Sequence, residues 1–114
     1  MLNRVRGSAT ERKSIALIFS ALGDETRLGL LNKLSDGSTR SISELAAGTE
    51  LTRQAVTKHL RVLEKAGVVQ SIRSGRESLF EFTPEKFQDM RAYLESVTQH
   101  WDSQLQRLKN FVER

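Results

Sequence analysis

The chain contains no cysteine among its 114 residues. Disulfide bonds, thiolate metal sites and thiol redox switches are therefore excluded. The chain also has a single proline, only 6% aromatic residues and no evident low-complexity tract or internal repeat. No apolar run approaches the ~20 residues that a membrane-spanning helix needs, so we expect a soluble protein.

The first residues, MLNRVRGSATERK, are basic but are not followed by an apolar segment. We therefore expect no secretory signal, a flexible segment over 1–8 and a cytoplasmic location. The content of 38% hydrophobic and 28% charged residues is typical of a globular protein. A chain of this length fits one domain, 1–114, with one core.

Catalytic motifs are missing from the sequence. No serine lies in a nucleophile elbow, and the seven glycines form no phosphate-binding loop. The neighbouring carboxylates Asp24 and Glu25 stand where a helix is expected to begin, and capping explains them. The sequence predicts a protein that is not an enzyme and has no cofactor.

Positive charge is concentrated in one segment. The whole chain has 18 Lys and Arg against 14 Asp and Glu, a net charge of +4. Between Arg53 and Arg76 there are six basic residues, and Glu64 is the single acid. This local surplus of five exceeds the net charge of the chain. Such a concentration indicates an anion-binding surface.

Four N-cap signals divide the first part of the chain into helices. Ser8, Asp24, Ser41 and Thr52 each precede apolar residues at helical spacing. The predicted helices run to about Leu22, to Leu34, to Ala47 and to just before Gly67. The last two are joined by about four residues, which is typical of a helix-turn-helix, over 41–66.

The pattern changes after Gly67. Residues 68–83, VVQSIRSGRESLFEFT, are rich in β-branched and aromatic residues and are split by Ser-Gly-Arg. This pattern predicts a β-hairpin, the wing. Thr83 as N-cap and Pro84 at the first helical position then predict a helix over 84–112. The predicted fold class is mainly α (α+β): a winged helix-turn-helix with a two-stranded wing and a long C-terminal dimerisation helix.

The last predicted helix has a continuous apolar seam. The seam residues recur every three or four positions: Phe87, Met90, Leu94, Val97, Trp101, Leu105, Leu108 and Val112. This helix would be about 43 Å long, whereas a compact domain of this size is roughly 34 Å across. We therefore expect the seam to face a second copy across a two-fold axis. The alternatives are a helix folded back on its own core, or one broken near Trp101.

The predicted helix that opens after Thr52 has a polar face without acids, made of Arg53, Gln54, Thr57, Lys58 and Arg61. An α-helix fits the DNA major groove, and its first turns reach base edges. Gln54 can pair with adenine, and Arg53 or Lys58 can donate to guanine. Thr57 can bond a phosphate or touch a thymine methyl. The alternative is a solvated helix in a protein-interaction domain.

Two further cations flank this interface. Arg61 lies a turn further along the helix, where backbone contact is favoured. Arg73 and Arg76 surround the predicted hairpin turn, and arginine there suits a narrow minor groove or flanking phosphates. The alternative for these two residues is plain solubility.

Several segments resemble one family. They are LGDETRLGLL, ISELA, LTRQAVTKHLRVLEKAGVV and SGRES, and the similarity covers about residues 15–112. The chain resembles the arsenic-repressor (ArsR/SmtB-type) winged-helix transcriptional regulators. This resemblance implies a homodimeric repressor that binds an inverted repeat, with recognition and wing contacts at the residues chosen above. It implies dimerisation through the first and last helices, here Ile15, Phe19, Met90, Leu94, Val97, Trp101, Leu105 and Leu108.

The sequence departs from the metal-sensing members of that family. The helix that reads SISELAAG has no metal-binding cysteines, and His59 and His100 cannot supply paired ligands on one helix. We expect no metal site; His59 is expected to contact phosphate or pack locally. An effector could be a small organic or reactive molecule, or regulation could follow abundance alone. A protein-interaction module and a repressor with oxygen and nitrogen metal ligands are the alternatives.

In a generic helix-turn-helix dimer, the two recognition helices enter successive major grooves about 34 Å apart. We expect that spacing from the sequence alone.

Overall fold

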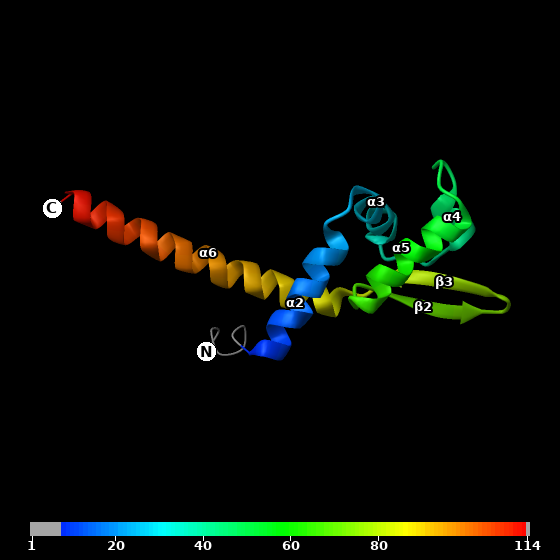
Figure 1. The fold of residues 1–114 in the computed structure, drawn as a ribbon, viewed down its shortest axis with the longest axis horizontal. Helices are drawn as coiled ribbons and strands as arrows, with labels where there is room; N and C mark the ends of the chain where they lie inside the picture. Colours follow the sequence, from blue (N-terminus) through cyan, green and yellow to red (C-terminus); the bar gives the residue numbers. More distant parts are fainter. Residues whose placement is uncertain (1–7, 114) are drawn as a thin grey trace.

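The computed structural model describes residues 8–113. Figure 1 shows an N-terminal body and one helix that leaves it. The elements are α2 (Ala9–Leu22), α3 (Glu25–Leu34), β1 (Arg40–Ser41), α4 (Ile42–Ala46), α5 (Arg53–Lys65), β2 (Val69–Ser74), β3 (Glu77–Phe82) and α6 (Pro84–Glu113). The predicted winged helix-turn-helix fold is confirmed. Residues 1–7 of the segment expected to be flexible lie outside the described range, and Ser8 is the N-cap of α2.

All four predicted N-caps are present. The side chains of Ser8, Asp24, Ser41 and Thr52 each accept a hydrogen bond from the backbone N–H three residues later. Ser41 forms a complete capping box, because Glu44 also accepts from the backbone N–H of Ser41. Each bond satisfies a donor that the first turn of a helix would otherwise leave unpaired.

The expected capping of α6 by Thr83 is wrong. The Thr83 hydroxyl is buried and has no hydrogen-bond partner among residues 8–113. The Thr83 backbone N–H donates instead to the Val68 carbonyl at 2.9 Å, which holds the residue beside the start of the wing. The helix still begins at Pro84, where a missing N–H leaves no helical bond unmade.

The sheet has one strand more than the sequence predicts. The strand order is β1-β3-β2, and both pairings are antiparallel. Arg40 of β1 lies opposite Phe80, and Ser41 lies opposite Leu79. The predicted two-stranded wing, β2 and β3, is confirmed. A strand of two residues is too short to show a period of two, so β1 left no detectable pattern.

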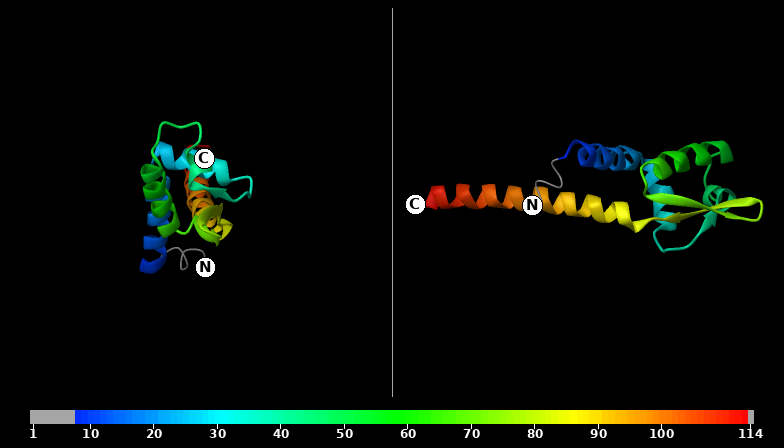
Figure 2. Two further views of the ribbon diagram at one scale, coloured as in Figure 1. Left: turned by 90° about the vertical axis from the view of Figure 1, so that its right-hand side faces the viewer. Right: turned by 90° about the horizontal axis from the view of Figure 1, so that it is seen from below.

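The core lies between α2, α3, α4, α5 and the sheet. Its largest side chains with no exposure are Ile18, Leu34, Leu45, Leu60 and Phe80. No residue of α6 is buried, and the helix meets the body mainly near its start, where the rings of Phe82 and Phe87 lie 4.9 Å apart. The described chain is therefore elongated, with extents of 67 × 27 × 21 Å (Figure 2).

Candidate nucleic-acid interface

Helix α5 is anchored by one face and exposes the other. Val56, Leu60 and Leu63 point into the core and are fully buried. The opposite side carries the polar residues that the sequence singles out: Arg53, Gln54, Lys58 and Arg61 are exposed and Thr57 is half-buried. The first turn of α5 contains no acid. Its free N–H groups and cationic side chains therefore present positive potential to solvent.

Four of the predicted recognition residues share one open hollow. Arg53, Gln54, Thr57 and Lys58 line it together with Ile42, the first residue of α4. The turn between α4 and α5 brings these elements together, and Gly48 at φ +79° provides the left-handed residue that this turn needs. The hollow is shallow and open, which suits the edge of a large polymer better than an enclosed small molecule.

The geometry narrows what Thr57 can do. Its Oγ1 donates to the Arg53 carbonyl at 2.8 Å. The hydroxyl proton is thus occupied within the helix, and the methyl group and one lone pair remain available. Contact with a thymine methyl therefore suits this conformation better than donation to a phosphate.

Arg61 is tied to the protein rather than free. Its Nη1 lies 2.8 Å from Oε1 of Glu64, and the other Glu64 oxygen accepts from the Ser71 hydroxyl at 2.9 Å. The Ser71 hydroxyl, together with Arg61, holds the pKa of Glu64 below its ordinary value. This group links α5 to β2 and offsets the charge of Arg61. Sequence spacing could not reveal it, because Ser71 follows seven residues later on a strand.

A second polar group, also absent from the sequence analysis, fixes α5 beside the end of α2. Arg27 donates through Nε to the Ala21 carbonyl at 2.6 Å and through Nη2 to the Ser20 carbonyl at 3.4 Å. Its Nη1 lies 3.2 Å from Nδ1 of His59 on α5. Arginine can only donate, so this His59 nitrogen must accept. The structure thus gives His59 a packing role, one of the two roles expected for it.

Asp24 completes this junction between α2, α3 and α5. Its Oδ2 accepts from the Arg27 backbone N–H at 3.0 Å and lies 3.9 Å from Nδ1 of His59. The Arg27 N–H, with smaller contributions from the charges of Arg27 and His59, lowers the pKa of Asp24. The carboxylate therefore acts as the N-cap of α3 and as a counter-charge beside the recognition helix.

The wing carries its two arginines at its free end. Arg73, Ser74, Gly75 and Arg76 are all exposed, and Gly75 at φ +61° makes the tight turn. Figure 1 shows the hairpin projecting from the end of the molecule that also holds α4 and α5. The sequence therefore places Arg73 and Arg76 correctly at a tip on the recognition side.

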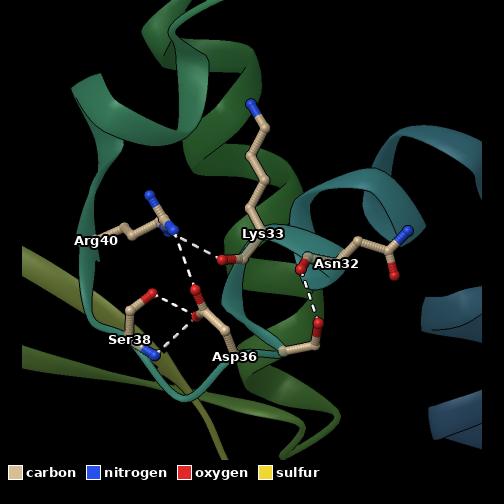
Figure 3. A network of polar contacts seen from close by, with 6 residues as sticks. Asn32, Lys33, Asp36, Ser38 and Arg40 are labelled. Carbon is tan, nitrogen blue, oxygen red and sulfur yellow. Dashed lines mark hydrogen bonds and ion pairs between the residues drawn. The ribbon is translucent and has the colours of Figure 1, made fainter.

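The loop that leads into the helix-turn-helix is held by its own polar contacts (Figure 3). The Asp36 carboxylate accepts from the N–H and hydroxyl of Ser38 at 2.9 and 2.6 Å and from Arg40 at 3.3 Å. Arg40 also donates to the Lys33 carbonyl at 2.9 Å. The Ser38 hydroxyl bond is the main reason that the pKa of Asp36 is lowered. Arg40 therefore serves the loop and is occupied there.

No group of three His, Cys, Asp or Glu side chains within residues 8–113 is arranged to hold a metal ion. His100 is exposed on α6. In the part of the chain that the structure describes, no helix is both long and apolar enough to cross a membrane.

Comparisons with known proteins agree with this geometry. Residues 24–71 match the model of the bacterial regulatory protein, arsR family. The HTH-type transcriptional regulator YuzN of Bacillus subtilis is 39% identical over 79 residues, 64% of this chain and 86% of that protein. The HTH-type transcriptional repressor SmtB of Mycobacterium tuberculosis is 35% identical over 63 residues, 55% of this chain and 46% of that protein.

Among solved structures, the ArsR-like transcriptional regulator from Rhodococcus sp. RHA1 superposes with a TM-score of 0.79 at 33% identity, covering 90% of this chain and 96% of that one. Fold and exposed recognition helix together define a transcriptional regulator with a winged helix-turn-helix DNA-binding domain. The chain belongs to the ArsR family.

Proposed function

We propose that the protein is a homodimeric repressor that binds an inverted-repeat operator and acts by binding alone, in the cytoplasm. One observation carries the proposal: Arg53, Gln54, Thr57 and Lys58 line one open hollow on an acid-free face of α5. In this proposal Gln54 accepts and donates to adenine, Arg53 or Lys58 donates to guanine, and the Thr57 methyl meets thymine.

The remaining cations would position the protein without reading sequence. Arg73 and Arg76 would contact phosphates or the minor groove on the flank of the site. Arg61 would contribute less than a free arginine, because Glu64 lies 2.8 Å from it. Phosphate contacts of this kind supply most of the affinity and make it depend on salt.

The dimer is supported by the apolar surface that the protomer leaves uncovered. Leu94, Val97, Trp101, Leu105 and Leu108 are all exposed on α6. The other proposed contacts lie nearer the body: Ile15 is buried, Met90 packs against the core, and Phe19 meets the ring of Tyr93 edge to face. Two copies are needed to read both halves of an inverted repeat. A small-molecule effector is not needed by any contact described above, and repression could follow abundance.

The test is fluorescence anisotropy with the purified protein and its own upstream DNA, against a scrambled duplex, over a salt series. We expect selective binding to the upstream DNA and a steep decrease in affinity with salt. Equal, weak binding to both duplexes, with no motif enriched from random DNA, would contradict the proposal and favour a winged helix that binds protein partners.

A metal-responsive repressor would instead change its DNA affinity when zinc is added and recover it with a chelator. The same titration, repeated with zinc and with EDTA, distinguishes that alternative.

A further inference from the structure

The second half of α6 leaves the body with its apolar side chains uncovered. Leu94 is 44% exposed, Leu105 47% and Trp101 63%, and no described residue of the protomer's own body covers them. Figures 1 and 2 show the helix extending away from all other elements. A row of large apolar side chains on an isolated helix marks an interaction surface.

We propose that two α6 helices pair antiparallel over their whole length, centred near Gln99, and that this register sets the distance between the two recognition helices. The inference rests on the proposed homodimer and adds the direction and register of its helix pair.

The spacing of the seam supports this register. When α6 is laid antiparallel on itself, its eight seam residues form four facing pairs whose midpoints all fall between positions 99 and 99.5. The facing pairs are Phe87 with Val112, Met90 with Leu108, Leu94 with Leu105, and Val97 with Trp101.

The sizes of the facing side chains support it too. Antiparallel pairing places the two largest rings, Trp101 and Phe87, each opposite a valine. Parallel pairing in register would place Trp101 against itself and Val97 against itself, so the seam would be too thick at one level and too thin one turn away. Close packing favours large side chains opposite small ones.

Charge favours the same direction. Residues 84–102 of α6 carry four acids and two bases, whereas residues 103–113 carry two bases and one acid. In an antiparallel pair the acidic half of one helix lies along the basic half of the other. The helix dipoles are also opposed in that arrangement, and they add where the helices run parallel.

A hollow on the body matches the proposed register. Ile15, Ala16 and Phe19 of α2 line it with Tyr93 of α6, and Arg12 also borders it. Tyr93 is next to Leu94, the residue that faces the partner's Leu105. The register thus brings an apolar side chain of the partner to the edge of an apolar hollow, next to the Phe19–Tyr93 ring pair.

The register has a consequence for DNA. Helices of 30 residues paired end to end have their first residues about 45 Å apart. Figure 1 shows α5 and the wing at the end where α6 begins, with α6 running away from them. The recognition helices would then be at least as far apart as the α6 starts. This exceeds the one-turn spacing of about 34 Å expected of a generic dimer, and it predicts half-site centres more than about 13 base pairs apart at ~3.4 Å per base pair.

Cysteine cross-linking tests the register cleanly, because the natural chain has no cysteine. Leu94→Cys and Leu105→Cys are purified separately, one of them labelled with ¹⁵N, then mixed and oxidised mildly. A disulfide needs Cα atoms within about 7 Å. Antiparallel pairing brings the two different cysteines together, and it separates identical ones by 11 residues, about 16 Å. Ser103→Cys, on the opposite side of α6, is the matched control for random collision.

The expected result is a mixed disulfide in the mixture and no cross-link in either variant alone. Cross-linking of Leu94→Cys alone, without the mixed species, would mean parallel pairing and overturn the proposal. Sedimentation as a dimer without any specific cross-link would place the interface elsewhere and also overturn it. Operator binding by the cross-linked dimer is measured separately, so that loss of DNA selectivity would refute the proposed function and leave the register standing.

Discussion

Helices α5 and α6 are both amphipathic, but they leave opposite faces uncovered. Helix α5 buries Val56, Leu60 and Leu63 in its own protomer and exposes its polar, acid-free side. Helix α6 buries no residue and exposes its apolar side from Leu94 onward. The uncovered face of each helix indicates the chemistry of its partner: a polyanion for α5 and a second apolar helix for α6.

The two helices also differ in how they are held. Helix α5 is fixed by the core and by Arg27, which reaches His59 at 3.2 Å, and it needs no partner to be ordered. The free half of α6 has its apolar side in water, so its stability should depend on a second copy. The predictions that follow use this difference.

The largest effect is expected from charges placed in the seam. Leu94→Asp combined with Leu105→Asp should weaken the dimer by about 1,000-fold, because each buried contact at the centre of an interface is worth about 2 kcal/mol or more. Analytical ultracentrifugation measures it, and Ser103→Asp on the opposite side of α6 is the control. A double variant that sediments like the natural protein would show that this seam is not the interface.

Apolar truncations in the two helices should differ in kind. Leu60→Ala in α5 should lower the free energy of unfolding by about 2–5 kcal/mol at every protein concentration, because it leaves a cavity in the core. Leu108→Ala in α6 should lower it by an amount that grows with protein concentration, because its contact lies between copies. Urea unfolding at two concentrations separates them. Equal, concentration-independent losses would contradict the distinction.

The polar face of α5 and the wing should also differ. Gln54→Ala should relax preference at one base position, at a cost of roughly 1–3 kcal/mol, whereas Arg76→Ala should weaken binding to all sequences equally and reduce the salt slope by about one. Anisotropy with the operator and its single-base variants measures both. If both substitutions weakened operator and random DNA identically, the roles assigned to these residues would be wrong.

The smallest effect concerns acid stability. The pKa of Glu64 is lowered in the folded protein, chiefly by the Ser71 hydroxyl, so the carboxylate stabilises the fold above its unfolded pKa near 4.5 and loses that contribution as the pH falls through its folded pKa. Glu64→Gln should cost about 0.2–1 kcal/mol at pH 7. The difference from the natural protein should shrink in strong acid. A difference unchanged between pH 7 and pH 2.5 would contradict this explanation.

Much of this fold could be predicted because its signals are local. Caps at Ser8, Asp24, Ser41 and Thr52 depend on bonds within one turn, and the buried stripe of α5 depends on helical spacing alone. The acid-free face of α5 follows from the same spacing, which is why the recognition residues could be chosen before their surroundings were known.

What the sequence did not predict depends on residues far apart in the chain. Strand β1 exists because Arg40 and Ser41 meet β3 about 40 residues later. Arg27 reaches His59 across 32 positions, and Ser71 reaches Glu64 from a strand. The Thr83 hydroxyl was expected to cap α6, but a backbone bond to Val68 holds the residue elsewhere. No pattern of spacing contains these contacts.

The central claim is that the acid-free face of α5 reads DNA as half of a dimer. Selection of binding sites from a pool of random duplexes with the full chain, followed by sequencing, tests it most directly. The claim predicts an enriched two-fold symmetric motif, which Gln54→Ala degrades at one position in each half. Recovery of no motif, or of a motif without two-fold symmetry, would contradict it.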